Sequence, residues 1–220
     1  MIICHSRKFV FFSFPKTGSE SLRDMLSDLN EETVTSYSKA TVASPWYSHM
    51  SPAEAKTAFA ARGLNIADYF TFTVTRNPYP RMVSIYEMVM AVDRSQRLWR
   101  GIGLPAKPFG KWLAGTQPGG AGGGGRNHDR WRKFGTWSTQ NWISGHEGRP
   151  IVDKVLKLEH LSRDLPAVLK ILDLPVPETL VHKNRRVSKD WHSYYDTATR
   201  ALVADRYAWD LDTYGYGLQD

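Results

Sequence analysis

The sequence predicts one α/β domain, in which a central parallel sheet of about four or five strands is flanked by helices. Two stretches lead to this prediction, because each reads as a buried strand, a short loop and an amphipathic helix. The first begins at Phe9 and the second at Tyr69. Loops at the carboxyl ends of parallel strands line a common crevice, where open α/β sheets bind their ligands.

The first stretch, residues 9–29, places a loop between a strand and a helix. Phe9 to Phe12 and Phe14 form a nearly continuous apolar run, as in a strand buried on both faces. After Pro15, the apolar residues follow helical spacing, namely Leu22, Met25, Leu26 and Leu29. The intervening loop leads into a helix N-terminus, where backbone N–H groups favour an anionic ligand.

Between the two stretches we expect a second short strand at Glu32–Ser36 and a helix that starts at Ser51. Ser51-Pro52-Ala53-Glu54 has an N-cap serine, a proline at the first helical position and a glutamate three residues after the cap. His49 therefore lies on a loop just before a helix.

The second stretch repeats the pattern of the first. Tyr69–Thr75 is dense in β-branched and aromatic residues, which favours a strand. Asn77 can cap the following helix and Pro78 can open it. Arg76 thus emerges at the carboxyl end of a strand, beside the loop of the first stretch.

The second half of the chain is less regular. A Gly- and Pro-rich segment at about 101–125 predicts a flexible insertion within a single domain that spans residues 1–220. The tryptophans of residues 126–142 are expected to pack in the core. We expect a strand at Asp153–Glu159, a helix at Leu161–Leu172, a basic loop at 183–189 and a terminal helix at Asp196–Trp209.

Composition narrows the function classes. Cys4 is the single cysteine, which excludes an intrachain disulfide and suits a reducing, cytoplasmic location. The sequence contains neither an apolar run that could span a membrane nor a convincing secretory signal. The net charge of +7 implies anionic partners.

Residues 15–21 differ from the P-loop of nucleotide triphosphatases, because the glycine that should precede the lysine is missing. What remains is a shorter cradle for an anion: Lys16 supplies a positive charge, Gly18 allows close backbone approach, and Thr17, Ser19 and Ser21 offer hydroxyl groups. Such a cradle suits a smaller anion than a magnesium-bound triphosphate.

Two motifs together resemble the sulfotransferases that use 3′-phosphoadenosine 5′-phosphosulfate (PAPS). Residues 15–22, Pro-Lys-Thr-Gly-Ser-Glu-Ser-Leu, resemble the family's 5′-phosphosulfate loop. Residues 76–86, with Arg76, Asn77, Pro78, Arg81, Ser84 and Tyr86, resemble its 3′-phosphate motif. Residues 157–161 and the closing Tyr-Gly-Tyr are also similar to family segments. The resemblance is closest to the carbohydrate sulfotransferases and implies a P-loop-like, three-layer fold.

The resemblance implies a role for each site residue. The donor nucleotide would lie on residues 16–21, comprising Lys16, Thr17, Gly18, Ser19, Glu20 and Ser21, and on Arg76 and Ser84. Lys16 would stabilise the charge that develops on the leaving phosphate oxygen. His49 is our choice of catalytic base, and Glu54 is the alternative. Further contacts to nucleotide or acceptor are expected from four basic residues: Arg81, Lys183, Arg185 and Arg186.

The sequence thus predicts a sulfotransferase that moves a sulfuryl group from PAPS to a hydroxyl group, or to an amine, and releases 3′,5′-ADP. No metal is expected, because the transferred group is already activated. A small molecule or carbohydrate is the expected acceptor, and the basic surface suits an anionic one. A magnesium-dependent small-molecule kinase and a basic nucleic-acid-binding protein are the alternatives. Nucleic acid is not the expected partner, because the basic residues are spread along the chain apart from short clusters at 126–133 and 183–189.

Overall fold

The computed structural model describes residues 1–92, 107–116, 135–144, 148–177 and 190–219. Its central sheet contains β1 (Ile2–Cys4), β2 (Phe9–Phe12), β3 (Phe70–Thr75) and β4 (Lys154–Lys157), in the order β1-β2-β3-β4. The strands β2, β3 and β4 are parallel, and β1 pairs antiparallel with β2 at one edge. The predicted α/β fold with a largely parallel sheet is therefore confirmed.

Two details of the predicted sheet differ from the structure. The edge strand β1 was not predicted, because Ile2–Cys4 is too short to show a pattern of its own. The strand expected at Glu32–Ser36 was wrong, since that segment contributes only an isolated bridge between Thr35 and Tyr47. An antiparallel neighbour for β2 comes instead from the amino-terminal residues, joined to it by a tight turn.

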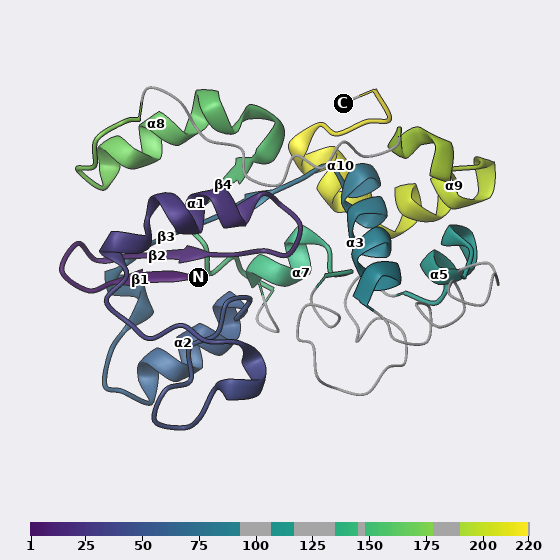
Figure 1. Cartoon of the computed structure of the whole chain (residues 1–220). Helices are drawn as coiled ribbons and strands as arrows, with labels where there is room; N and C mark the ends of the chain where they lie inside the picture. Colours follow the sequence, from purple (N-terminus) through teal and green to yellow (C-terminus); the bar gives the residue numbers. More distant parts are fainter. Residues whose placement is uncertain (93–106, 117–134, 145–147, 178–189, 220) are drawn as a thin grey trace.

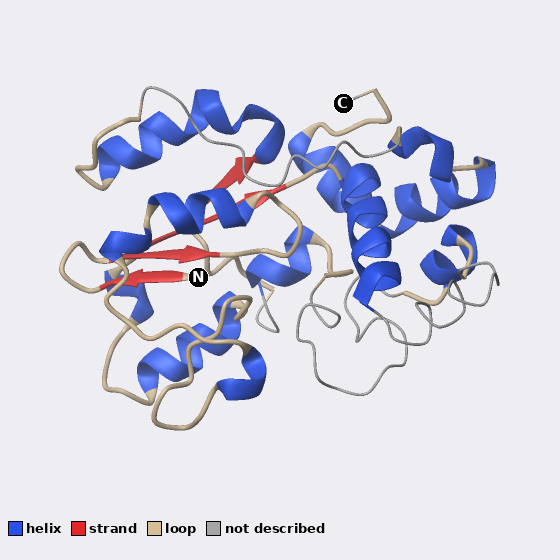
Figure 2. Cartoon of the chain, viewed as in Figure 1, coloured by secondary structure: helices blue, strands red, loops and turns tan. Residues whose placement is uncertain are grey.

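Helices cover both faces of the sheet (Figures 1 and 2). On one face, α1 (Ser19–Met25) and α8 (Leu161–Ile171) pack on Phe9 and Phe11. On the other face, α2 (Pro52–Ala60) and α7 (Thr139–Ser144) pack on Val10 and Phe12. Successive residues of β2 thus point to opposite faces, and both faces are buried. Together these elements form the three layers of the fold.

A second group of helices lies beyond the carboxyl ends of the parallel strands (Figure 1). It comprises α3 (Pro78–Val92), α5 (Phe109–Ala114), α9 (Thr197–Arg206) and α10 (Ala208–Tyr214), which share one apolar cluster. The predicted terminal helix is split at the buried Tyr207, whose hydroxyl group donates to the Thr136 carbonyl at 2.6 Å. Within the segment expected to be flexible, α5 buries Phe109 and Trp112, while residues 101–106 and 117–125 lie outside the described residues.

Short 3-10 helices complete the fold: Ser27–Leu29, Tyr37–Lys39, Ile66–Asp68, Leu158–His160 and Trp191–Tyr194. None of the helices in the described part of the chain is long and apolar enough to cross a bilayer.

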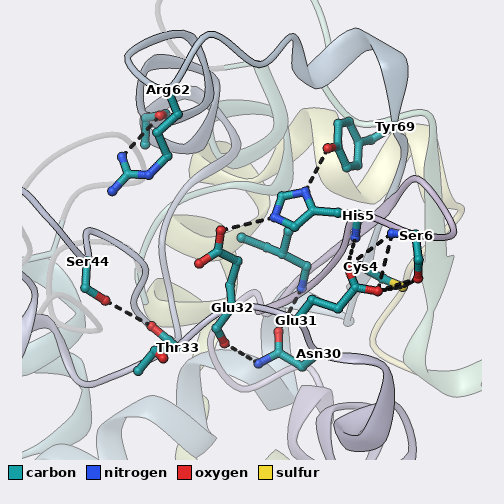
Figure 3. A network of polar contacts seen from close by, with 12 residues as sticks. Cys4, His5, Ser6, Asn30, Glu31, Glu32, Thr33, Ser44, Arg62 and Tyr69 are labelled. Atoms are coloured by element: carbon teal, nitrogen blue, oxygen red, sulfur yellow. Dashed lines mark hydrogen bonds and ion pairs between the residues drawn. The ribbon is translucent and has the colours of Figure 1, made fainter.

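A polar network holds the turn between β1 and β2 (Figure 3). The imidazole of His5 lies between the Tyr69 hydroxyl group at 2.8 Å and the Glu32 carboxylate at 3.1 Å. The Glu31 carboxylate accepts from the backbone N–H groups of His5 at 2.7 Å and Ser6 at 3.1 Å. Because Tyr69 precedes β3, this network lies at the amino end of the parallel strands, opposite the site described next.

Candidate functional site

The two motifs meet at the carboxyl edge of the sheet. The strands β2 and β3 pair in parallel and end at Phe12 and Thr75, so the loops that follow them leave the sheet on the same side. The Arg76 guanidinium donates from Nη1 to the Lys16 carbonyl at 3.3 Å, across sixty residues of sequence. The parallel pairing therefore brings the loop of the first stretch into contact with the arginine of the second.

The loop before α1 has an unusual backbone. Lys16 and Gly18 both have left-handed conformations, with φ values of 66° and 71°. The hydroxyl groups of Thr17 and Ser19 both donate to the Phe14 carbonyl, at 2.9 and 3.3 Å. In this structure these two hydroxyl groups hold the shape of the loop. Alternation of left-handed and other residues turns backbone N–H groups inward, as in anion-binding nests.

Gly18 is required by space as well as by backbone conformation. A Cβ atom on residue 18 would lie 2.5 Å from Cδ1 of Leu158, which follows β4. The loop therefore lies directly against the Leu158 side chain at the start of the 3-10 helix that follows β4. Of the remaining loop residues, Lys16 and Ser21 are half-buried and Glu20 is exposed.

Arg76 lies among both positive and negative groups. Burial lowers its pKa, while the negative charge of Glu159 acts in the opposite direction and the positive charge of Arg81 adds to the lowering. The next residue, Asn77, caps α3 as predicted, since its side-chain oxygen accepts from the backbone N–H of Tyr79 at 3.0 Å. This cap fixes the direction in which Arg76 leaves the sheet. Ser84 lies half-buried on α3.

His49 reaches the same edge from the loop before α2. Its Nδ1 atom lies 2.8 Å from the Ser13 carbonyl. A carbonyl oxygen only accepts, so Nδ1 carries the hydrogen and Nε2 has the lone pair in the neutral ring. Burial lowers the pKa of His49 to about 4, and the charges of Arg23 and Lys16 act in the same direction against the Ser13 hydrogen bond. At neutral pH the imidazole is therefore uncharged and able to accept a proton at Nε2.

The alternative base, Glu54, is already engaged. Its Oε2 atom accepts from the backbone N–H of Ser51 at 3.1 Å, from the Ser51 hydroxyl group at 2.8 Å, and from the hydroxyl group of Tyr47. The predicted capping box at the start of α2 is confirmed. These three contacts place the Glu54 carboxylate in the cap of α2, so it is already occupied by structural hydrogen bonds.

The four additional basic residues have different positions. Arg81 is fully buried, with its guanidinium 4.4 Å from the centroid of the Phe14 ring and 5.7 Å from that of Tyr207. With no exposed surface of its own, the Arg81 side chain contacts Phe14 and Tyr207 and donates to the Trp137 carbonyl. Lys183, Arg185 and Arg186 lie outside the described residues.

Two groups at this edge had no role assigned to them from the sequence. Arg23 lies on α1, and its positive charge contributes to the low pKa of His49. Glu159 follows β4 and accepts hydrogen bonds from the backbone N–H of Asn77 and from the hydroxyl group of Tyr216. The position of Glu159, a charged residue shortly after the third parallel strand β4, could have indicated its role from the sequence. Nothing in the sequence distinguished Arg23 in this way.

Comparison with known proteins assigns the chain at the level of the family. The model of a family described as "Sulfotransferase family" matches residues 1–217, nearly the whole chain. No similar protein was found among those of curated function. The described residues contain no group of three or more His, Cys, Asp or Glu side chains that could hold a metal ion.

Proposed function

Because the chain belongs to the sulfotransferase family, we propose that it transfers a sulfuryl group from PAPS to a hydroxyl group of an acceptor and releases 3′,5′-ADP. An amine is the alternative acceptor group. The observation that carries the proposal is the contact between the Arg76 guanidinium and the Lys16 carbonyl. This contact supports a single site in which Lys16 and Arg76 supply two separate positive charges. A donor such as PAPS, which has anionic groups at both its 5′ and 3′ positions, requires such a pair.

The residues at this edge suit such a donor. PAPS supplies an activated sulfuryl group whose leaving group is a phosphate. Lys16, on a loop with two left-handed residues, would stabilise the negative charge that develops on that phosphate. Arg76 offers a planar guanidinium, which binds phosphate through two parallel hydrogen bonds. Ser84, from α3, is proposed to add a hydroxyl group to the 3′-phosphate.

His49 is proposed to remove the proton of the acceptor. The bond between the acceptor oxygen and sulfur forms while the bond between sulfur and the leaving phosphate oxygen breaks, and the proton of the acceptor moves to Nε2. The Ser13 carbonyl holds the Nδ1 hydrogen and thereby fixes which nitrogen is basic. A pKa of about 4 leaves the imidazole of His49 uncharged at neutral pH, and it also makes His49 a weaker base than an ordinary histidine.

For the acceptor we propose a carbohydrate, with an anionic one favoured by the net charge of +7. Trp142 does not provide a stacking face for a sugar ring, because it is fully buried and stacks on Phe14 with 4.9 Å between ring centroids. The packed role expected for this tryptophan is confirmed. The case for a carbohydrate therefore depends on charge and on the resemblance of the motifs.

A binding experiment tests the donor. We expect 3′,5′-ADP to raise the melting temperature of the protein more than ADP or ATP does, because only 3′,5′-ADP carries the 3′-phosphate. Arg76→Ala should weaken 3′,5′-ADP binding about tenfold to a hundredfold, the loss expected for charge-assisted hydrogen bonds. Lys170→Ala, an exposed change on α8, is the control. Equal stabilisation by all three nucleotides would contradict the assignment of the donor.

A kinetic experiment tests the base. His49→Ala should lower turnover about a hundredfold to ten-thousandfold, the usual contribution of a general base, while 3′,5′-ADP binding is retained. The control is His192→Ala, since His192 pairs with Asp190 on the surface of the second helical group. Turnover that survives His49→Ala would eliminate His49 as the base.

A further inference from the structure

The carboxylate of Glu159 lies at the centre of a set of contacts behind Arg76. Its Oε1 atom accepts from the backbone N–H of Asn77 at 2.8 Å, and its Oε2 atom accepts from the Tyr216 hydroxyl group at 3.0 Å. Each carboxylate oxygen thus holds a different segment. One is the residue that directly follows Arg76, and the other belongs to the carboxyl-terminal part of the chain.

The carboxyl-terminal segment Tyr214–Gly217 is attached at three points. In addition to Glu159, the side-chain amide of Asn77 donates to the Gly217 carbonyl at 2.7 Å. The ammonium group of Lys157 donates to the Tyr214 carbonyl at 2.6 Å and lies 4.3 Å from the centroid of the Tyr216 ring. Gly215, with φ of 59°, ends α10 and lets the chain turn back toward the sheet. All three attachment points belong to the loops after β3 and β4 or to the end of β4.

These contacts bear on the charge and the direction of Arg76. Asn77 is fixed from two sides: its backbone N–H donates to Glu159, and its side-chain amide donates to Gly217 of the strap formed from Tyr214–Gly217. The negative charge of Glu159 is the main influence that opposes the lowering of the Arg76 pKa by burial. The negative charge of Glu159 therefore acts on the Arg76 guanidinium, while the Nη1 atom of Arg76 donates to the Lys16 carbonyl.

We propose that Glu159 is a positioning residue, which together with the Tyr214–Gly217 strap holds Arg76 in the orientation that receives the 3′-phosphate of the nucleotide. This inference rests on the proposed function, because it assigns Arg76 to that phosphate. According to this proposal, the affinity for 3′,5′-ADP depends in part on Tyr214–Gly217, which lie outside both phosphate motifs. The strap acts through Arg76 and Asn77 and does not need to touch the nucleotide.

Two substitutions of Glu159 separate its charge from its hydrogen bonds. Glu159→Gln keeps an oxygen that can accept from the Asn77 N–H but removes the negative charge, whereas Glu159→Ala removes both. In the protein without nucleotide, we expect hydrogen exchange of the Asn77 amide to accelerate at least about tenfold in Glu159→Ala and to change little in Glu159→Gln, because one hydrogen bond of this kind is lost only in the first. Unchanged exchange in Glu159→Ala would show that the carboxylate of Glu159 does not hold the Asn77 N–H, and it would overturn the proposal.

Calorimetry then measures the effect on binding. We expect Glu159→Gln to weaken 3′,5′-ADP binding about tenfold, since the guanidinium loses the charge that orients it. Asp164→Asn removes a carboxylate that pairs with Arg163 on the surface of α8 and serves as the control. Unchanged or tighter binding by Glu159→Gln would refute the positioning role, because it would mean that Glu159 is neutral toward the phosphate or repels it.

Tyr216→Phe tests the strap with a smaller change. It removes the hydroxyl group that donates to Glu159, and we expect 3′,5′-ADP binding to fall severalfold with little change in the melting temperature of the ligand-free protein. Tyr214→Phe is the matched control, because the strap uses the backbone carbonyl of Tyr214. Equal affinities of the two variants would contradict the role of the strap. If the unmodified protein does not prefer 3′,5′-ADP, the proposed function fails, and amide exchange still decides whether Glu159 holds Asn77.

Discussion

Gly18→Ala is a sharp test of how the loop fits against the sheet. Gly18 has a φ of +71°, and a Cβ atom at this position would lie 2.5 Å from Cδ1 of Leu158. The substitution therefore combines two separate costs. One is the left-handed backbone conformation, and the other is a steric overlap with a side chain that follows β4.

The two costs can be added from the structure. A residue with a Cβ atom in the left-handed conformation costs about 1–2 kcal/mol. Forcing a methyl group into a filled space costs about 1–3 kcal/mol. We therefore expect Gly18→Ala to lower the free energy of unfolding by about 2–5 kcal/mol, which most single domains of about 5–15 kcal/mol stability survive. The loop should also bind 3′,5′-ADP more weakly, because Leu158 must move.

Urea denaturation of matched variants separates the two costs. Gly63 has almost the same φ, +70°, but no atom lies within 4 Å of the position of its Cβ atom. Gly63→Ala therefore measures the backbone cost alone. In a double-mutant cycle, Leu158→Ala should recover about 1–3 kcal/mol of the unfolding free energy that Gly18→Ala loses, because it removes the side-chain atoms that the new methyl group would overlap.

Two results would refute this reasoning. Equal costs for Gly18→Ala and Gly63→Ala would mean that the loop does not press against Leu158. If the losses of unfolding free energy from Gly18→Ala and Leu158→Ala are additive, the loop again does not press against Leu158, since two side chains that overlap in one space do not act independently.

Three further predictions concern charge and pH. Burial lowers the pKa of His49 to about 4, so kcat/KM should decrease only as the pH falls through about 4, where the imidazole becomes protonated. A decrease centred near pH 6.5 would contradict the burial of His49. Arg81→Met should lower the free energy of unfolding by about 1–3 kcal/mol, because the Trp137 carbonyl loses its buried donor. The change also removes the positive charge that opposes the raising of the Asp210 pKa by burial. In urea denaturation, combining Arg81→Met with Asp210→Asn should recover part of the loss, and no recovery would contradict this charge coupling. Hydrogen bonds lower the pKa of Glu31 from 4.5 to about 2, with Ser6 the largest contributor, so its carboxylate stabilises the fold above pH 4.5 and loses this effect as the pH falls toward 2. The difference in melting temperature between the protein and Glu31→Gln should therefore shrink between pH 6 and pH 2.5, and a constant difference would refute the linkage.

The elements with strong local signals were predicted well. The strands at residues 9–12 and 70–75 follow runs of aromatic and β-branched residues, and α2 begins at the predicted capping box. Elements that depend on tertiary contacts were missed or misplaced. The edge strand β1 has only three residues and exists because β2 offers it a partner. The terminal helix is divided at Tyr207, whose ring is buried and whose hydroxyl group donates to the carbonyl of Thr136, 71 residues away.

The candidate site was predictable in part for the same reason. Lys16, Arg76 and His49 each lie beside a local signal, namely a strand end or a helix start. Glu159 lies beside such a signal too, but its partners are distant: its hydrogen bonds go to Asn77, 82 residues away, and Tyr216, 57 residues away. The burial of Arg81 also depends on Phe14 and Tyr207, which meet only in the folded chain.

The sequence by itself determined the two strand-loop-helix units, the chemical types of the side chains proposed to bind phosphate and the family resemblance, because each is encoded within a short stretch of residues. The tertiary structure alone decided how these groups are connected. Parallel pairing of β2, β3 and β4 brings Lys16, Arg76 and Glu159 to one edge, and the carboxyl-terminal strap then joins that edge through Tyr216. Charges and hydrogen bonds act over a few ångströms in space regardless of sequence separation, so only the fold could show which residues surround Arg76 and Asn77.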